Sequence, residues 1–278
     1  MRALSAHLPE VLEQTRTRWR DGESFPGAST GLDDLDALIG GIEPCTVTVV
    51  GAPSGFLLSS IAATVTLGLA RTTPVVYRVV GRAPTDVGMH LLSAQARVSL
   101  SALARGRLTV DEWRRVDQAA ALLGASRIWL DPVSAGAAPS TDALWDLGVR
   151  ASGEPGVVVF DRHRPDRGLC PPGSDVPRVH ERSVPPAPGP AAAIVLVETR
   201  RPVADVRVLQ VGDLPEVDRL WDIADTVLLA HETRQAVKSV PPRVTVEVSM
   251  VKHPYGVGDS CRVAYLRGIG LLANLSEE

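Results

Sequence analysis

Ten residues, GAPSGFLLSS at positions 51–60, follow the apolar run TVTVV and have the layout of a phosphate-binding loop. Such a loop follows a buried strand and turns on glycine, so that backbone N–H groups face the phosphates. It then supplies a lysine to the phosphates and a hydroxyl to magnesium. Here Leu57 and Leu58 take the positions of the lysine and the hydroxyl. Taken alone, the segment also fits an ordinary glycine-rich turn between a strand and a helix.

Composition limits the class of protein. The chain has 278 residues, is 45% hydrophobic and carries a formal net charge of −3. These values favour one principal domain with a substantial core, and any nucleic-acid contact would come from a local patch. No apolar run reaches the length of a membrane span, and the N-terminus lacks the layout of a secretion signal. We therefore expect a cytoplasmic protein without a membrane segment.

The cysteines indicate neither a disulfide framework nor a metal centre. Cys45, Cys170 and Cys261 are far apart in the sequence and form no CxxC pair. Both a disulfide-rich fold and a structural zinc site need closer or paired cysteines. We expect reduced thiols and no bound metal.

The elements that must position the turn begin with an amphipathic helix. Apolar residues that include Leu8, Leu12 and Trp19 recur mostly at helical spacing, and DGESFPGAST then breaks the pattern. We expect a linker helix with its tether over residues 1–26 and one domain over residues 27–278. The apolar stripe of this helix is expected to dock on another subunit or on a related protein of the same family.

Apolar runs alternating with helical stretches predict an α/β domain with a mostly parallel sheet. The predicted strands are TVTVV, PVVYRVV, RIWLD, GVVVFD, AAIVLVE, DTVLLAHE and the VTVEVSMVK run, with YGVGDS as a turn before CRVAYL. The DTVLLAHE and VTVEVSMVK strands are expected to close the sheet as a meander. Residues 162–190 are rich in proline and arginine and have no periodicity, which predicts a long loop.

Four stretches together resemble the C-terminal motor domain of the DnaB replicative helicase family. They are STGLDDLDALIGGIEP, HLLSAQARVSLSALARGRLTVDEW, GVVVFD and GDLPEVDRLWDIADTVLLAHE. The resemblance covers nearly the whole chain, and the first helix is similar to the family's linker helix. The family's separate N-terminal domain has no counterpart. The resemblance implies a RecA-like three-layer fold, and hydrolysis of a magnesium-bound nucleoside triphosphate between subunits of a hexameric ring around DNA.

The resemblance also implies where the nucleotide site should lie, and most of its positions are altered. Phe56 stands where the family has the last glycine of the phosphate loop, and Gly81 stands at the glutamate that activates water. Glu198 replaces a glutamine that senses the phosphate. Asp161 matches the acid that holds the magnesium-bound water.

The family has a second functional site on its final strands, and this sequence contains only one of the two basic residues of that site. The family carries a lysine and an arginine, two residues apart, that reach the nucleotide of the neighbouring subunit. Lys252 matches the lysine, whereas Pro254 replaces the arginine.

We therefore expect a degenerate nucleotide site with no catalytic residue and no ATP or magnesium cofactor. Its members are Gly51, Ala52, Pro53, Ser54, Gly55, Phe56, Leu57, Leu58, Gly81, Asp161 and Glu198. Such a protein acts by binding DNA, a helicase or itself. One alternative is an active ATPase or helicase in which unconventional residues, for example Arg78 or Arg82, supply the missing groups. Another is a sensor that binds a nucleotide or small molecule without hydrolysis.

Contacts to DNA or to a partner are expected from Lys252 and from the arginines of the long loop. These arginines are Arg162, Arg164, Arg167, Arg178 and Arg182. Mobile arginines that touch phosphate give weak, sequence-independent binding. Acids within the loop dilute its charge, so a solvated loop and a protein-recognition loop remain as alternatives.

Overall fold

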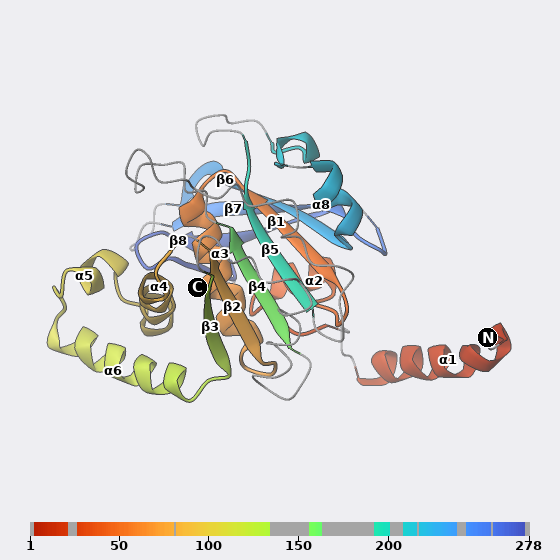
Figure 1. Ribbon diagram of the computed structural model, residues 1–278, viewed down its shortest axis with the longest axis horizontal. Coiled ribbons are helices and arrows are strands. Elements are labelled where there is room, and N and C mark those ends of the chain that lie inside the picture. Colours follow the sequence, from red (N-terminus) through yellow and green to blue (C-terminus); the bar gives the residue numbers. More distant parts are fainter. Residues whose placement is uncertain are drawn as a thin grey trace.

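The computed structural model describes residues 3–21, 27–80, 82–133, 156–162, 192–200, 208–215, 217–237, 243–256 and 258–275. Nine strands within these ranges form one sheet in the order β3-β2-β4-β5-β1-β6-β7-β8-β9 (Figure 1). The strands are β1 Val47–Ala52, β2 Val75–Val80, β3 Ile128–Val133, β4 Val157–Arg162, β5 Ala192–Glu198, β6 Thr226–Val237, β7 Arg243–Lys252, β8 Ser260–Leu266 and β9 Leu271–Ala273.

The sheet is mostly parallel, as the sequence predicts. The neighbours from β3 through β6 in this order all pair in parallel, whereas β7, β8 and β9 add antiparallel strands at one edge. Strands β1 and β5 are buried along nearly their whole length, as expected for parallel strands covered on both faces. The short strand β9 is absent from the sequence-based prediction.

Helices cover both faces of the sheet and complete the three layers. The helices of the described ranges are α1 Leu4–Asp21, which stands apart from the sheet, α2 Asp33–Ile39, α3 Gly55–Leu69, α4 Pro84–Ala96, α5 Leu100–Ala104, α6 Val110–Gly124, the 3-10 helix η1 Val211–Asp213 and α8 Val217–Ile223. One apolar core joins α2, α3 and α4 to one sheet face. A second core joins α8 and residues 209–214 to the opposite face. The fold is α/β, in agreement with the expected class.

A buried carboxylate holds the segment that leads into α2. Asp36 accepts hydrogen bonds from the Thr30 backbone N–H at 2.9 Å, the Thr30 hydroxyl at 2.7 Å and the Ser29 hydroxyl at 2.6 Å. The same segment crosses α3 so closely that a Cβ on Gly68 would lie 2.0 Å from the Thr30 carbonyl oxygen. Residues of the motif STGLDDLD therefore stabilise the local fold, and this role does not depend on any ligand.

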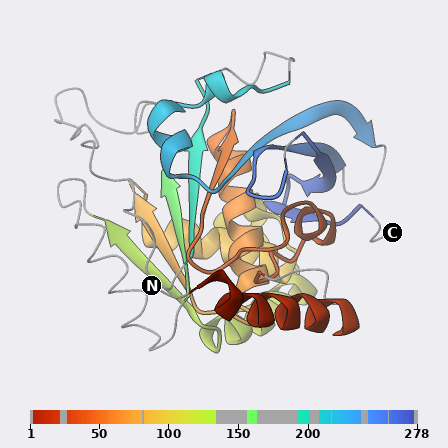
Figure 2. The same cartoon turned by 90° about the vertical axis from the view of Figure 1, so that its right-hand side faces the viewer.

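Helix α1 projects away from the sheet (Figure 1), and in the view of Figure 2 it lies in front of the rest of the molecule. Leu4, Leu8, Val11 and Leu12 are each about half exposed or more. The predicted first helix is thus confirmed for residues 4–21, while the side chain of Trp19 and the tether at 22–26 lie outside what the structure describes. Among the described helices, none is long and apolar enough to span a membrane.

Candidate functional site

The turn after β1 is short because the strand continues through the first two residues of the glycine motif. Gly51 and Ala52 pair with Val197 and Glu198 of β5. Pro53 and Ser54 alone connect the strand to α3, which begins at Gly55. The Ser54 hydroxyl caps the helix by accepting from the Leu57 N–H at 3.5 Å. The chain therefore makes a compact turn between β1 and α3.

Packing accounts for the glycine that opens the motif. A Cβ on Gly51 would lie 2.5 Å from Cδ2 of Leu214 and 3.0 Å from Cδ2 of Leu229. These leucines belong to the core between the sheet and α8. The absence of a side chain at Gly51 is thus required by the opposite face of the sheet.

The two leucines of the motif are core residues. Leu57 is 1% exposed and Leu58 is 2% exposed, and both pack in the core that joins α3 to the sheet. A lysine at the first position would have to extend toward a ligand at the helix start, and a hydroxyl at the second would have to face a cation. Here both positions are occupied by apolar side chains that are fully withdrawn from solvent.

Phe56 lies in the first turn of α3, where its ring faces residues of α4 and β8. Its ring is 43% exposed and lies with its centroid 5.8 Å from that of His90 and 6.4 Å from that of Tyr265. The Tyr265 hydroxyl lies 3.2 Å from the Ser60 hydroxyl. Burial raises the pKa of Tyr265 to about 12, so this phenol is neutral at physiological pH.

Asp161, one residue before the end of β4, is a buried carboxylate with two donors. The Tyr77 hydroxyl donates to its Oδ2 at 2.8 Å, and the Arg82 Nη1 lies 3.3 Å from the same oxygen. The same Nη1 donates to the Ser59 hydroxyl at 2.5 Å, and that hydroxyl donates to the Gly55 carbonyl at 2.9 Å. Arg82 thus joins the first turn of α3 to the end of β4.

Arg78 points to the other side of β2 and takes no part in this cluster. It pairs with Asp131 on the adjacent strand β3, through Nε at 3.0 Å and through Nη2. Its side chain is 4% exposed, and burial lowers the pKa of this guanidinium while Asp131 opposes the shift. Of the two arginines considered from the sequence, only Arg82 reaches the candidate site.

His90 is a site residue that the sequence does not identify. Burial, and next the charge of Arg82, lower its pKa, while Asp161 and Asp86 act in the opposite direction. Its Nδ1 is buried and has no hydrogen-bond partner among the described residues. His90 lies on α4, and only the packing of α4 beside α3 brings its ring to Phe56.

The remaining predicted residues do not join the cluster. Glu198 ends β5 half-buried, beside Ala52 in the sheet register. Lys252 is held by its own chain, because its Nζ donates to the Trp221 carbonyl at 2.5 Å and lies 5.1 Å from the centre of the Trp221 ring. Arg162 is described only as the last residue of β4. Gly81, Arg164, Arg167, Arg178 and Arg182 lie outside the described residues.

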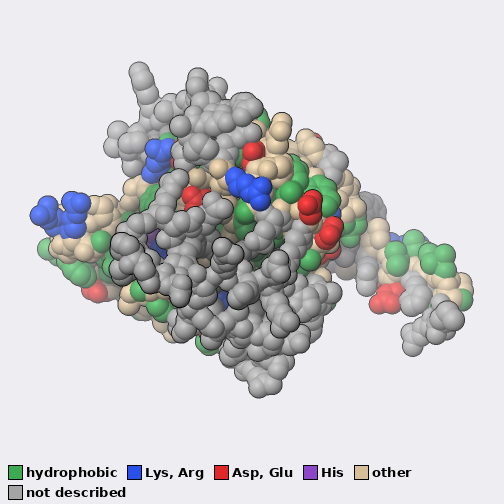
Figure 3. Space-filling view, turned by 45° about the horizontal axis from the view of Figure 1, so that its top comes forward, with side chains coloured by type: hydrophobic (Ala, Val, Ile, Leu, Met, Phe, Trp, Pro, Cys, Tyr) green, Lys and Arg blue, Asp and Glu red, His purple; other side chains and the backbone are tan. Residues whose placement is uncertain are grey.

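Charge on the visible surface is dispersed. Figure 3 shows blue and red side chains lying apart from each other, over the described part of one face, without a continuous basic surface. No group of three or more potential metal ligands occurs among the described histidines, cysteines and acids. The described surface therefore offers no obvious electrostatic footprint for nucleic acid on this face.

Comparison with known proteins agrees with this fold. The family description "DnaB-like helicase C terminal domain" matches residues 27–140. The replicative DNA helicase DnaB of Treponema pallidum (strain Nichols) is 26% identical over 115 residues, which are 41% of this chain and 26% of that protein. The matched region thus spans about a quarter of the length of this curated relative.

Two solved structures share the fold over 99% of this chain. The ATPase domain of G40P has a TM-score of 0.76 and 15% identity, with 99% of that chain covered. A DnaB-like replicative helicase, whose structure addresses its interactions with primase, has a TM-score of 0.72 and 16% identity, with 68% of that chain covered. At these identities the likeness establishes the helicase-domain fold.

Proposed function

The chain is DnaB-like over residues 27–140, and we propose that it acts by binding a protein partner or DNA, with a nucleotide site that no longer hydrolyses ATP. The observation that carries this proposal is the burial of Leu57 and Leu58 at the positions of the lysine and the hydroxyl. Phosphoryl transfer depends on positioned positive charge at the phosphates and on the metal that the hydroxyl helps to hold. Two apolar side chains in the core supply neither.

The residues present do not fit magnesium triphosphate. Magnesium prefers oxygen ligands in near-octahedral geometry and takes part of its shell from the phosphates. Leu58 offers no oxygen, and Asp161 already accepts from Tyr77 and Arg82. The backbone of Gly51 and Ala52 is paired within the sheet, so that only Pro53 and Ser54 remain as a turn before α3.

An active ATPase is the alternative, and one observation favours it. Arg82 places a positive charge between α3 and Asp161, where an unconventional site could use it. That guanidinium is already bonded to both Ser59 and Asp161, however, so phosphate binding would have to break contacts that hold a buried carboxylate. We therefore favour the non-hydrolysing function.

The stripe on α1 supports binding to another protein chain. Leu4, Leu8, Val11 and Leu12 form one exposed apolar face on a helix that stands apart from the sheet (Figure 1). We propose that this face docks on a second copy or on a helicase ring. Contact with DNA through Arg162, Arg164 and Arg167 stays a prediction.

Equilibrium titration with magnesium and a fluorescent ATP analogue, together with a phosphate-release assay, tests the proposal. We expect neither binding at millimolar nucleotide nor turnover. Turnover that disappears in Asp161→Ala would overturn the proposal and establish the active alternative. Binding without turnover would instead identify a nucleotide sensor.

A further inference from the structure

We propose that the Arg82 guanidinium is a built-in cation of this site, which takes the place between α3 and Asp161 that a metal ion has in a working phosphate loop. This inference rests on the proposed loss of nucleotide binding and assigns the residue that replaces the ligand. Arg82 comes two residues after the end of β2, and its Nη1 lies 2.5 Å from the Ser59 hydroxyl and 3.3 Å from Oδ2 of Asp161.

The charge of Asp161 requires such a partner. The Asp161 side chain is 3% exposed, and a buried carboxylate is tolerated only when it is paired and hydrogen-bonded. Tyr77 supplies a hydrogen bond but no charge, because burial and then Asp161 raise the pKa of this phenol well above its ordinary value. Arg82 is 14% exposed and contributes the positive charge to this carboxylate.

The geometry is that of a bridge between two elements. The contacts run from the Gly55 carbonyl through the Ser59 hydroxyl and Arg82 to Asp161, and so connect the first turn of α3 with the end of β4. In a phosphate loop, a hydroxyl near the helix start and an acid at a strand end approach the same metal ion. A guanidinium between a hydroxyl and an acid satisfies both without any ligand from solution.

A double-mutant cycle tests whether the pair behaves as a buried ion pair. Arg82→Gln and Asp161→Asn are combined, and the unfolding constant of each variant is measured by urea denaturation. We expect Arg82→Gln to raise the unfolding constant at least about 30-fold, and the double variant to recover at least about tenfold of that loss. Arg82→Lys, which keeps the charge, should recover part of it. If Arg82→Gln does not fold, recovery of folding by added Asp161→Asn carries the same information.

The exposed pair Arg114 and Asp111, 2.8 Å apart on α6, is the matched control. Its cycle of Arg114→Gln and Asp111→Asn should show a coupling of no more than about threefold, since exposed pairs contribute little. Coupling between Arg82 and Asp161 that does not exceed this control would overturn the inference.

A divalent cation provides the second readout. Manganese at millimolar concentration should raise the thermal unfolding midpoint of Arg82→Gln, because it can then approach Asp161, but not that of the unaltered protein or the double variant. Equal stabilisation of all three proteins would refute the built-in cation. Nucleotide binding by the unaltered protein would refute the proposed function itself. Absence of both nucleotide binding and coupling would refute only the inference about Arg82.

Discussion

Leu57 shows at the level of one residue what surroundings a lysine at this position of the motif would meet. The side chain is 1% exposed in a core formed by α3 and the sheet. Its neighbours in this core are apolar, so an ammonium there would lack both water and an acceptor. A change at Leu57 therefore also disturbs the core in which it packs.

We expect Leu57→Lys to lower the free energy of unfolding by about 4 kcal/mol, because a buried lysine must lose its charge or bring water into the core. Urea denaturation measures the change. Leu122→Lys is the control, since Leu122 is 60% exposed on α6 and the change there should stay within about 0.5 kcal/mol. A Leu57→Lys variant as stable as the unaltered protein would contradict this expectation.

His90 should make the protein sensitive to acid. Its folded-state pKa lies below the ordinary value of 6.5, first because of burial and next because of Arg82. The unfolded chain therefore takes up a proton at higher pH than the folded chain does. Stability is retained above about pH 6.5 and falls as the pH is lowered below it, by at most about 1.4 kcal/mol per pH unit from this group.

The variant His90→Gln removes that contribution. Urea denaturation between pH 7.5 and pH 5 should show a smaller loss of stability for the variant than for the unaltered protein. An identical dependence on pH in the two proteins would show that the burial of His90 does not affect its protonation.

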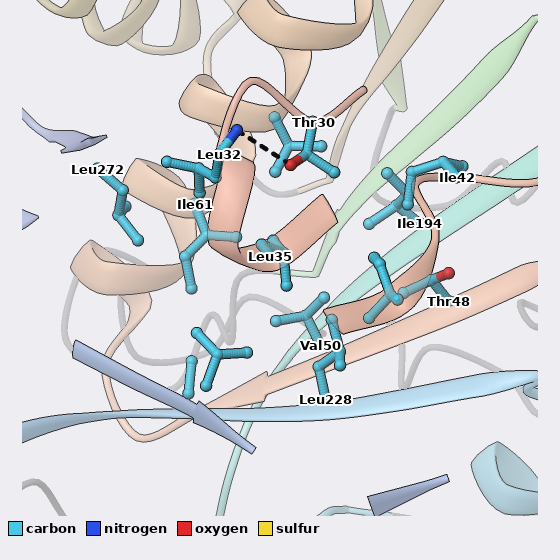
Figure 4. A pocket seen from close by; sticks show the side chains of 14 residues that line it. Thr30, Leu32, Leu35, Ile42, Thr48, Val50, Ile61, Ile194, Leu228 and Leu272 are labelled. Atoms are coloured by element: carbon cyan, nitrogen blue, oxygen red, sulfur yellow. Dashed lines mark hydrogen bonds between the residues drawn. The ribbon is translucent and has the colours of Figure 1, made fainter. Parts of the chain in front are cut away.

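At the level of elements, the packing of α2 and α3 on the sheet leaves a small apolar cavity. Its volume is about 30 Å³, and its lining includes Leu35 of α2, Ile61 of α3 and Val50 of β1 (Figure 4). A single water fits such a volume but needs polar partners, and the accessible lining is apolar. The cavity is therefore a packing defect close to the turn and not a ligand site.

Filling this cavity should stabilise the protein. We expect Val50→Ile to raise the free energy of unfolding by about 0.7 kcal/mol, from roughly 24 cal/mol per Å³ of cavity removed. Val49→Ile on the opposite face is the control, because Val49 is 0% exposed and does not line the cavity. Overpacking there should cost about 1–3 kcal/mol. Equal effects of the two changes would show that the cavity cannot accept a methyl group.

At the level of the whole molecule, α1 exposes an apolar surface that has no partner within the described chain. Solvent exposure of four large apolar side chains on one helix is costly, and burying them against another chain would recover that free energy. If a second copy is the partner, we expect the interface to hold the chains together without completing a catalytic site. Lys252 is bonded to the Trp221 carbonyl, and Pro254 stands where the family has an arginine.

Sedimentation velocity tests this role of α1. The unaltered protein should sediment as an assembly, and Leu8→Ala/Leu12→Ala should shift it to the monomer while leaving its unfolding midpoint unchanged. Glu13→Ala, on the same helix and also exposed, should leave the mass unchanged. Monomeric behaviour of both the unaltered protein and the double variant, with no helicase-type partner retained, would remove α1 as a docking element.

Local sequence patterns determined the class of fold and the alterations in the glycine motif. Apolar runs bounded by turns predict β1, β2, β4 and β5, because strands buried on both faces need apolar residues at nearly every position. The substitutions at 57 and 58 are likewise evident from the order of residues alone.

Only the tertiary structure decided which group lies against the Asp161 carboxylate. Arg82 is 23 residues from Ser59 and 79 from Asp161, and only the placement of β2 beside β4 and of α3 above them brings these groups together. The same holds for Gly51, whose missing side chain makes room for Leu214 on the far face. Local periodicity reports which face a residue takes, whereas contacts between strands depend on their order and register, which no short stretch of sequence contains.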